Sequence, residues 1–515
     1  MTLAGPWLLL ALPLLLRALP WGKGTPERPP SWRLDLPIAL GLGLTVALLC
    51  TALLSQALTE YFPLSAADFD HYCGLVGRVA EGNLQSEPGV RMPAPAWLPA
   101  AASHSLGLID GLALQSFLAL VATCAGLYLW GLTLRGRLAG TLAALLAGTI
   151  GPLAFLARDL SFYPVVVAGS VVLAAAVVAS VRFRGVGPSA LAGVAAAVLL
   201  LADVRGVLFA APLVGVGLAF AVLRARRWPA ALLRVGLLAA PVVASWFIAH
   251  AVVPAQLTGL EAQAVMYADQ ALRNAGESPD LLAREQAATR HSPGFVWGHA
   301  SPTALPGAFL FLGRLTDRVP PAARDSQQNV ELRARHLVPW AAPGLIALAI
   351  CLVGLARKPW RLVALGLCAA PFLGMLWATG QVLPQERHLA TGLAVLPVLL
   401  GVAAAVLAEA TPPVDAGSAR PPGVLSWRQA LLVGAIAAAM LGLPPSWLDY
   451  QAGWRKGIVQ SEPRTLLQRV KDHRSIPSNP CTRALGQGVA DPWWPSRLYP
   501  RARRVLDGSD TWAPD

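Results

Sequence analysis

Two carboxylates stand just after the first long apolar run of the sequence. The stretch 67–78 reads Ala-Asp-Phe-Asp-His-Tyr-Cys-Gly-Leu-Val-Gly-Arg, so Asp68 and Asp70 are two positions apart. Near a bilayer surface, one carboxylate can act as a general base, or two can hold a divalent cation such as Mg²⁺ or Mn²⁺. The alternative is a solvated loop in which an aspartate caps the start of a helix. The spacing alone leaves both interpretations open.

Other reactive residue types form no known catalytic or metal-binding motif. The sequence contains no P-loop, nucleophile elbow, HExxH or dinucleotide fingerprint, which argues against a nucleotide-driven pump. Cys73 and Cys481 fall in segments that we place outside the membrane, where an oxidising compartment would permit a disulfide, although a separation of 408 positions leaves the pairing open. The other four cysteines lie in apolar runs, where cysteine behaves as a small hydrophobe.

The composition predicts a membrane protein. The chain has 515 residues, of which 55% are hydrophobic and only 13% are charged. Soluble domains are about 25% charged, so an ordinary soluble enzyme, a disordered protein and a disulfide-rich secreted module are excluded. Repeated apolar runs near the roughly 20 residues that cross a bilayer indicate an all-α, polytopic helix bundle.

Eleven runs have the length and composition of transmembrane helices. They cover residues 36–59, 107–132, 138–157, 160–181, 188–204, 206–223, 231–256, 338–356, 360–380, 389–408 and 428–445. Residues 3–20 are apolar but contain three prolines and Arg17, so an interfacial or half-inserted helix, a twelfth span and a cleaved signal all remain open. We interpret Pro152, Pro164, Pro212 and Pro241 as kinks within spans rather than helix ends.

The charge distribution predicts the orientation of these spans. One set of loops holds 17 of the 41 basic residues but only four acidic ones, so it carries the whole net charge of +13. The positive-inside rule assigns this face to the cytoplasm. The high isoelectric point therefore reflects topology rather than nucleic-acid binding, and the C-terminus is expected outside a bacterial inner membrane.

Three outer segments and two membrane modules follow from this topology. We expect an N-terminal interfacial or half-inserted segment, residues 1–35, and an N-terminal transmembrane module, residues 36–256, with a first outer loop at 60–106. A large outer loop spans 257–337, a C-terminal transmembrane module spans 338–445, and residues 446–515 form an outer tail. Because the inner loops are short, chemistry is expected on the outer face.

The sequence resembles the GT-C superfamily, which comprises polytopic glycosyltransferases that use polyprenyl-phosphate-linked sugars, as in protein mannosyltransferases and the aminoarabinose transferase of lipid A. In the first outer loop, Asp68, Tyr72 and Gly82 match the family's acidic residue, tyrosine and glycine. Phe69 departs from the pattern, because the family often has a second acidic residue there. Further short similarities lie at 91–95, 131–140, 157–164 and 384–388.

The resemblance implies sugar transfer from a polyprenyl-phosphate donor to a lipid, glycan or protein acceptor by inverting attack. Asp68 is our choice of general base, with Asp70 as a second catalytic candidate and Asp68 with Asp159 as candidate metal ligands. Arginine forks bind phosphate oxygens. The residues expected to bind substrate are Arg158, Arg205, Arg387, His388, Tyr72 and His71.

Three alternatives remain open. Each outer arginine has an acidic neighbour, so pairing with Asp159, Asp203 or Glu386 would explain it without a substrate. The chain could instead be a non-catalytic, GT-C-like protein of envelope assembly, with Phe69 marking lost chemistry. A transporter or lipid flippase is the third reading, but such proteins place ionisable residues mid-membrane, whereas these spans carry almost none away from their ends.

Overall fold

The computed structural model describes residues 34–58, 66–82, 94–157, 161–203, 206–224, 227–252, 338–356, 359–381 and 386–409. Every regular element within these ranges is helical, in agreement with the predicted all-α class. The helices of the N-terminal half are α2 (Asp35–Leu58), α3 (Ala66–Ala80), α4 (Ala94–Leu106), α5 (Leu108–Arg135), α6 (Arg137–Ala147), α7 (Gly151–Ala154), the 3₁₀ turn η1 (Phe155–Ala157), α8 (Tyr163–Phe183), α9 (Val186–Ala202), α10 (Val207–Leu223) and α11 (Trp228–Val252). Those of the C-terminal half are α17 (Val338–Leu355), α18 (Pro359–Gln381), α19 (Glu386–Leu393) and α20 (Leu396–Glu409).

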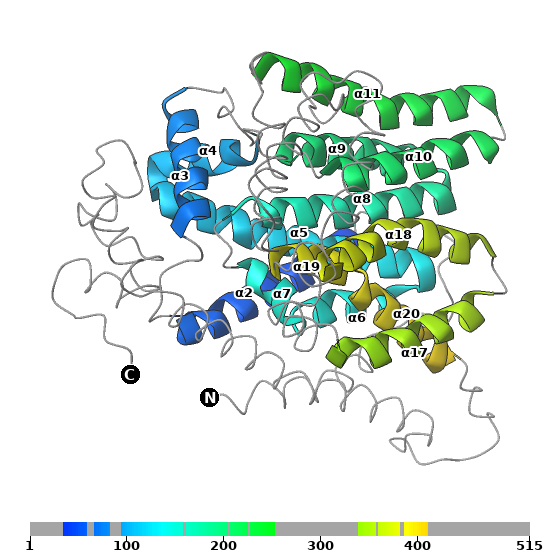
Figure 1. Ribbon diagram of the computed structural model, residues 1–515. Helices are drawn as coiled ribbons and strands as arrows, with labels where there is room; N and C mark the ends of the chain where they lie inside the picture. The colour runs from blue at the N-terminus through cyan, green and yellow to red at the C-terminus, as the bar shows by residue number, and fades with distance from the viewer. Residues whose placement is uncertain are drawn as a thin grey trace, which may run out of the picture.

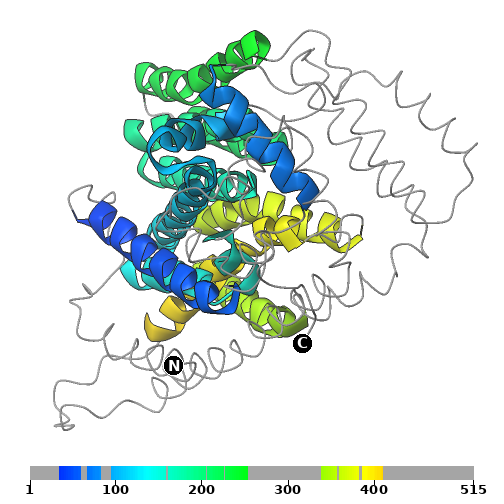
Figure 2. The ribbon, with the colours of Figure 1, turned by 90° about the vertical axis from the view of Figure 1, so that its left-hand side faces the viewer.

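The long helices pack side by side as a bundle. Helices α8, α9, α10 and α11 run as roughly parallel rows, while α3 and α4 lie together at one end of the bundle (Figure 1). Figure 2 looks at the molecule from that end, with α3 in front of the helices behind it. We call this end the outer end, because it holds the segments that the charge pattern places outside.

Three helices in the described ranges are long and apolar enough to cross a membrane. They cover Gly111–Arg135, Tyr163–Phe183 and Trp228–Ile248. Shorter apolar helices account for seven more of the predicted runs, and the run at 428–445 and residues 3–20 lie outside the described ranges. The total of eleven or twelve spans therefore stays a prediction, as do the boundaries of the modules and outer segments.

Two predicted spans are wrong as single helices. The run 138–157 is divided between α6 and α7 by a turn at 148–150, and the run 389–408 is divided between α19 and α20 by a turn at 394–395. In each case a proline, Pro152 or Pro397, stands in the first turn of the following helix. Proline has no amide N–H to donate, and its ring clashes with the carbonyl four residues earlier. It is therefore compatible with the first turn of a helix, but the helix before it cannot continue through it.

The other proline predictions divide by position in the helix. Pro164 begins α8 instead of kinking a span, which corrects the prediction. Pro212 lies inside α10 and Pro241 inside α11, as expected.

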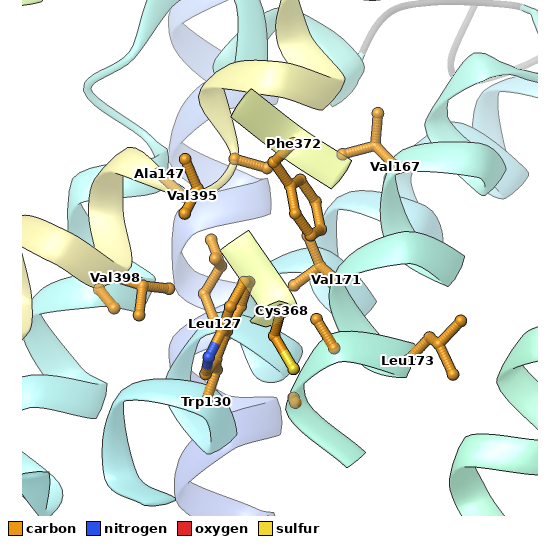
Figure 3. Packing of buried hydrophobic residues seen from close by; sticks show 14 of the residues in the cluster. Leu127, Trp130, Ala147, Val167, Val171, Leu173, Cys368, Phe372, Val395 and Val398 are labelled. Carbon is orange, nitrogen blue, oxygen red and sulfur yellow. The ribbon is translucent and has the colours of Figure 1, made fainter. Parts of the chain in front are cut away.

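An aromatic cluster fills the centre of the bundle. The ring of Phe372 in α18 lies 5.5 Å from that of Trp130 in α5 and 5.2 Å from that of Phe209 in α10, measured between centroids. Figure 3 shows Trp130 and Phe372 beside Cys368 and Val171, which come from α18 and α8. Because lipid is as apolar as these side chains, such helices associate through close packing rather than through exclusion from water.

Glycines permit the closest helix contacts. A Cβ atom at Gly140 in α6 would lie 2.5 Å from the carbonyl oxygen of Tyr128 in α5, and one at Gly401 in α20 would lie 2.5 Å from that of Ala139. No side chain fits at these distances. The packing of α5, α6 and α20 therefore depends on these glycines.

Arginines join the helix ends at the opposite, inner end. Four of them donate a hydrogen bond to a carbonyl in the last turn of a neighbouring helix: Arg135 to Gly354, Arg182 to Thr133, Arg224 to Val181 and Arg234 to Ala221. Such bonds satisfy carbonyls that a helix end leaves without partners and place positive charge at the negative end of the helix dipole. The turns that the charge pattern assigns to the cytoplasmic face are joined by these contacts at one end of the bundle.

A partly exposed ion pair fixes the start of α2 to this inner end. The Nε of Arg137 lies 2.9 Å from Oδ1 of Asp35, and the hydroxyl of Tyr128 donates to the same oxygen at 3.3 Å. Asp35 is one of the four acidic residues assigned to the inner face, and it is taken up by this structural contact.

Candidate active site

The amphipathic helix α3 packs its apolar face onto the outer end of the bundle. Tyr72, Leu75, Val76 and Val79 are buried in a cluster of their own. Its other members come from α4, from the first turns of α5 and from the start of α8: Ala96, Ala100, Leu112, Ala113, Phe162 and Tyr163. This cluster, which we call the outer cluster, fixes the first outer loop against the bundle.

An aromatic contact joins α3 to the turn before α8. The rings of Tyr72 and Phe162 meet edge to face, with their centroids 4.3 Å apart, and both side chains are almost fully buried. Such pairs contribute about 0.5–1.5 kcal/mol beyond the burial of their area. A direct contact of Tyr72 with substrate stays a prediction, whereas its packing role is observed. Phe162 was not identified from the sequence as a site residue, although its position directly before Tyr163-Pro164 is a visible aromatic signal.

The predicted carboxylates lie in the first turns of α3, and the helix fixes the angle between their positions. Asp68 and Asp70 are the third and fifth residues of a helix that begins at Ala66, so neither is the cap before it. Positions two apart on a helix are separated by about 200° and do not face each other. A cation shared by Asp68 and Asp70 stays a prediction, because their side chains lie outside the described part of the structure.

Helical register distinguishes the two positions further. Positions 68, 72, 75 and 79 follow the spacing i, i+4, i+7 and i+11 of a single helix face. Tyr72, Leu75 and Val79 on that face are buried against the bundle. Position 68 thus lies on the face of α3 that carries the outer cluster, and position 70 lies about 200° around the helix, on the face of Gly74 and Gly77. The side chains of Asp68, Asp70 and His71 themselves fall outside the described part of the structure.

The predicted turn with Arg158 and Asp159 leads into the outer cluster. These two residues lie outside the described ranges, between η1 and Ser161. Beyond them, the backbone amide of Tyr163 donates to the hydroxyl of Ser161 at 3.2 Å, and Phe162 contacts Tyr72. The sequence neighbours of Arg158 and Asp159 therefore lie against α3.

The short helix α19 approaches the same corner from the C-terminal half. It packs against α7, α8 and α18. Arg387 and His388 are its second and third residues, and their side chains fall outside the described part, while Ala390 and Leu393 are buried. A Cβ at Gly392 would lie 2.6 Å from Leu376 of α18, so α19 is held closely there.

Arg205 lies in the sequence between α9 and α10, outside the described ranges, where a turn is closed by the residues on either side. The amide of Gly206 donates to the carbonyl of Asp203 at 2.8 Å, and a Cβ at Gly206 would lie 2.3 Å from the carbonyl oxygen of Leu199. Helix α9 contacts α4, a helix of the outer end. The turn thus adjoins the outer end, but no described contact joins it to α3 or α19.

The structure brings together helices rather than a completed set of side-chain contacts. Helix α3 and the turn before α8 meet through Tyr72 and Phe162, and α19 packs on the adjacent α7 and α8. Among the described side chains no group of three potential metal ligands occurs. A cation held by Asp68 and Asp159 stays a prediction, because neither side chain is described.

Comparisons with known proteins give a likeness of fold. The chain is similar to the oligosaccharyltransferase AglB from Archaeoglobus fulgidus, solved in complex with an inhibitory peptide and a dolichol-phosphate: identity is 12%, TM-score 0.49, and coverage 94% of this chain and 62% of that one. For the apo form of the A. fulgidus oligosaccharyltransferase, identity is 14%, TM-score 0.48, and coverage 84% and 58%. For ArnT from Cupriavidus metallidurans bound to undecaprenyl phosphate, identity is 15%, TM-score 0.44, and coverage 82% and 78%.

The resemblance to GT-C glycosyltransferases therefore rests on the sequence motifs given above. The chain spans only about three fifths of the length of the oligosaccharyltransferase structures. At such identities and TM-scores the likeness concerns helical arrangement alone and carries no information on donor, acceptor or activity. No protein-family profile matches the sequence, and no curated protein matches it.

Proposed function

We propose that this chain is a membrane glycosyltransferase that moves a sugar from a polyprenyl-phosphate donor to an acceptor at the outer face of the membrane. The observation that supports this most directly is the contact between Tyr72 and Phe162. It sets the helix that carries Asp68 against the turn that follows Arg158 and Asp159. A segment with two carboxylates and a segment with an adjacent arginine and aspartate, far apart in the sequence, thus adjoin at the outer end of the bundle.

The proposed reaction needs a base for the acceptor and cations for the leaving group. The acceptor hydroxyl or amine attacks the anomeric carbon, and its proton passes to the carboxylate of Asp68. The bond from that carbon to the phosphate oxygen breaks, and the polyprenyl phosphate leaves with the electron pair. Arg158, Arg205 and Arg387 are the proposed donors to its oxygens, since fixed positive groups stabilise charge that develops in the transition state.

Asp68 is a better candidate than Asp70 because of its place on α3. Its position shares the helix face of Tyr72, Leu75 and Val79, which is directed toward the bundle. A base must reach its substrate within hydrogen-bond distance, so a residue on the bundle side suits a donor held among the helices.

The charged residues that are buried in the described ranges do not favour a transporter. Asp35, Arg234 and Arg361 are buried, and each lies in the first turns of its helix at the inner end. A transport path would instead place ionisable residues near the middle of the bilayer. The experiment below distinguishes a transferase from a non-catalytic protein of envelope assembly.

The test compares Asp68→Asn with Asp70→Asn, which makes the same chemical change on the opposite side of α3. The full-length protein is placed in vesicles with a panel of undecaprenyl-phosphate sugars and membrane extract as acceptor, and release of undecaprenyl phosphate is measured. We expect loss of at least about 10²-fold in Asp68→Asn, the usual contribution of a general base, and near-normal release in Asp70→Asn. Equal activity of Asp68→Asn and the unsubstituted protein excludes Asp68 as the base, and no release from any donor supports the assembly role.

A further inference from the structure

The exposed side of α4 carries a tryptophan and a leucine next to each other. Trp97 is 37% exposed and Leu98 is 46% exposed, whereas Ala96 and Ala100, on the other side of the helix, belong to the outer cluster. The helix has 13 residues and contains no aspartate, glutamate, lysine or arginine. A helix of this length is too short to cross a bilayer. These two exposed side chains therefore do not belong to a span, unlike the exposed apolar residues of the long helices.

A close backbone contact places this part of α4 at the outer edge of the membrane. A Cβ at Gly111 of α5 would lie 2.5 Å from the carbonyl oxygen of Pro99, the residue that follows Leu98. Gly111 is also the first residue of the apolar stretch by which α5 can cross a membrane. Trp97 and Leu98 therefore lie close to the level at which this span begins.

The same side of α5 faces lipid farther into the membrane. Leu118 follows Gly111 at i+7, so the two positions share one face of α5 and are about 10 Å apart along its axis. Gly111 is buried beneath α4, whereas Leu118 is 42% exposed within the span. Helix α4 thus covers this face of α5 only at its outer end, directly beside a surface that faces lipid.

The exposed side of α4 changes from apolar to polar along the helix. Trp97 and Leu98 are followed at i+7 by His104 and Ser105, which are also exposed. The chain then turns at Gly107, where φ is +90°, and enters α5. The polar end of the exposed side is therefore next to this turn, and the apolar end is next to the start of the span. This order matches a boundary between water and lipid.

From these observations we propose that α4 is an interfacial anchor, with Trp97 and Leu98 inserted between the lipid headgroups of the outer leaflet. Tryptophan is enriched at this level of a membrane because its ring is amphipathic. The partner is a lipid surface, so another apolar side chain at position 97 would preserve the contact. Because Ala96 and Ala100 pack with α3 in the outer cluster, the anchor also holds α3 at the membrane surface. The anchor does not depend on the proposed sugar transfer.

The experiment measures the depth of single labelled positions in the full-length protein. A spin label is attached to Trp97→Cys or to Leu98→Cys in a background with Cys73→Ser and Cys481→Ser, and the protein is placed in phosphatidylcholine nanodiscs. Relaxation of the label by oxygen, which concentrates in lipid, is compared with relaxation by a water-soluble nickel chelate. We expect oxygen to have the larger effect at both positions, as at the lipid-facing reference Leu118→Cys. Both side chains are exposed, and Leu98→Cys decides the result if Trp97→Cys does not yield a monodisperse protein.

The matched control is Ser105→Cys, which lies on the exposed side of the same helix. There the nickel chelate should have the larger effect. A larger effect of nickel at position 97 or 98 would mean that this side of α4 faces water, and the anchor would be wrong. Protection from both reagents would show that another part of the chain or another protein covers α4. A preference for oxygen at Ser105→Cys as strong as at Leu98→Cys would place the whole helix in lipid and would also overturn the interfacial position.

Discussion

At the scale of single residues, the functional value of an acidic side chain depends on the side of the helix that it occupies. Asp68 and Asp70 are nearly equivalent in the sequence, but α3 turns through about 200° between them. One position lies toward the outer cluster and the other lies away from it. This distinction depends on the helical conformation of α3, since a loop of the same sequence imposes no fixed angle between its side chains.

The contact between Tyr72 and Phe162 yields a prediction about catalysis rather than about folding alone. Tyr72→Leu keeps an apolar side chain in the outer cluster but removes the edge-to-face contact, which measures 4.3 Å between centroids. Because Asp68 stands one helical turn before Tyr72, a small displacement of α3 misplaces the proposed base. We expect the transfer rate to fall by about tenfold or more, with donor KM little changed, as measured by initial rates at saturating donor.

The control for Tyr72→Leu lies on the neighbouring helix. Trp97 in α4 is 37% exposed and is not a member of the outer cluster, so Trp97→Leu removes an aromatic ring from the same region without loosening α3. Its transfer rate should match that of the unsubstituted protein. Similar losses in the two variants would mean that α3 does not position the base.

At the scale of elements, hydropathy predicts helix positions well where an apolar run meets charge. The run 36–59 corresponds to α2 at Asp35–Leu58, and the run 206–223 corresponds to α10 at Val207–Leu223. The breaks after α6 and α19 were not predicted, because the residues immediately next to each turn include no charged side chain that would mark it. Their signal is proline in the first turn of the next helix, at Pro152 and Pro397, and we interpreted the first of these as a kink.

The candidate site was predictable to a smaller extent for a related reason. The order of the motifs indicated the segments that contain Asp68, Arg158 and Arg387. It contained no information on the contact that joins the segment of Asp68 to that of Arg158. Tyr72 and Phe162 are 90 positions apart and meet only because α3 folds back onto the start of α8. Such contacts depend on packing complementarity, which no local pattern in a single sequence encodes.

Close helix packing gives a prediction for α5 and α6. Gly140→Ala places a Cβ atom 2.5 Å from the carbonyl oxygen of Tyr128, so the two backbones must separate. We expect a loss of about 1–3 kcal/mol of stability, the usual cost of overpacking, seen as a lower melting temperature in nanodiscs. Gly41→Ala in α2 meets nothing within 4 Å. This control should be neutral or more stable by about 0.5–1 kcal/mol, since alanine favours helix; a fall equal to that of Gly140→Ala would contradict the packing account.

At the scale of the whole molecule, the two ends of the bundle have opposite characters. The inner end joins helix termini through arginines such as Arg135 and Arg224, each bonded to a carbonyl of a neighbouring helix. The outer end joins helices through the apolar packing of the outer cluster. Positive charge thus has a structural role at the end that the positive-inside rule assigns to the cytoplasm, which couples the orientation of the chain to its packing.

This asymmetry makes the orientation testable with single exposed positions. Glu81 follows α3 at the outer end and Arg227 precedes α11 at the inner end, and both are exposed. In a background with Cys73→Ser and Cys481→Ser, the cysteines Cys50, Cys124, Cys351 and Cys368 are buried and should not react. A membrane-impermeant maleimide should then label Glu81→Cys from the outside of intact cells, and Arg227→Cys only after the membrane is opened. The reverse pattern would place Asp68 in the cytoplasm, on the side of the membrane opposite to the expected donor and acceptor. The proposed transferase would then be wrong even if every helix contact described above were correct.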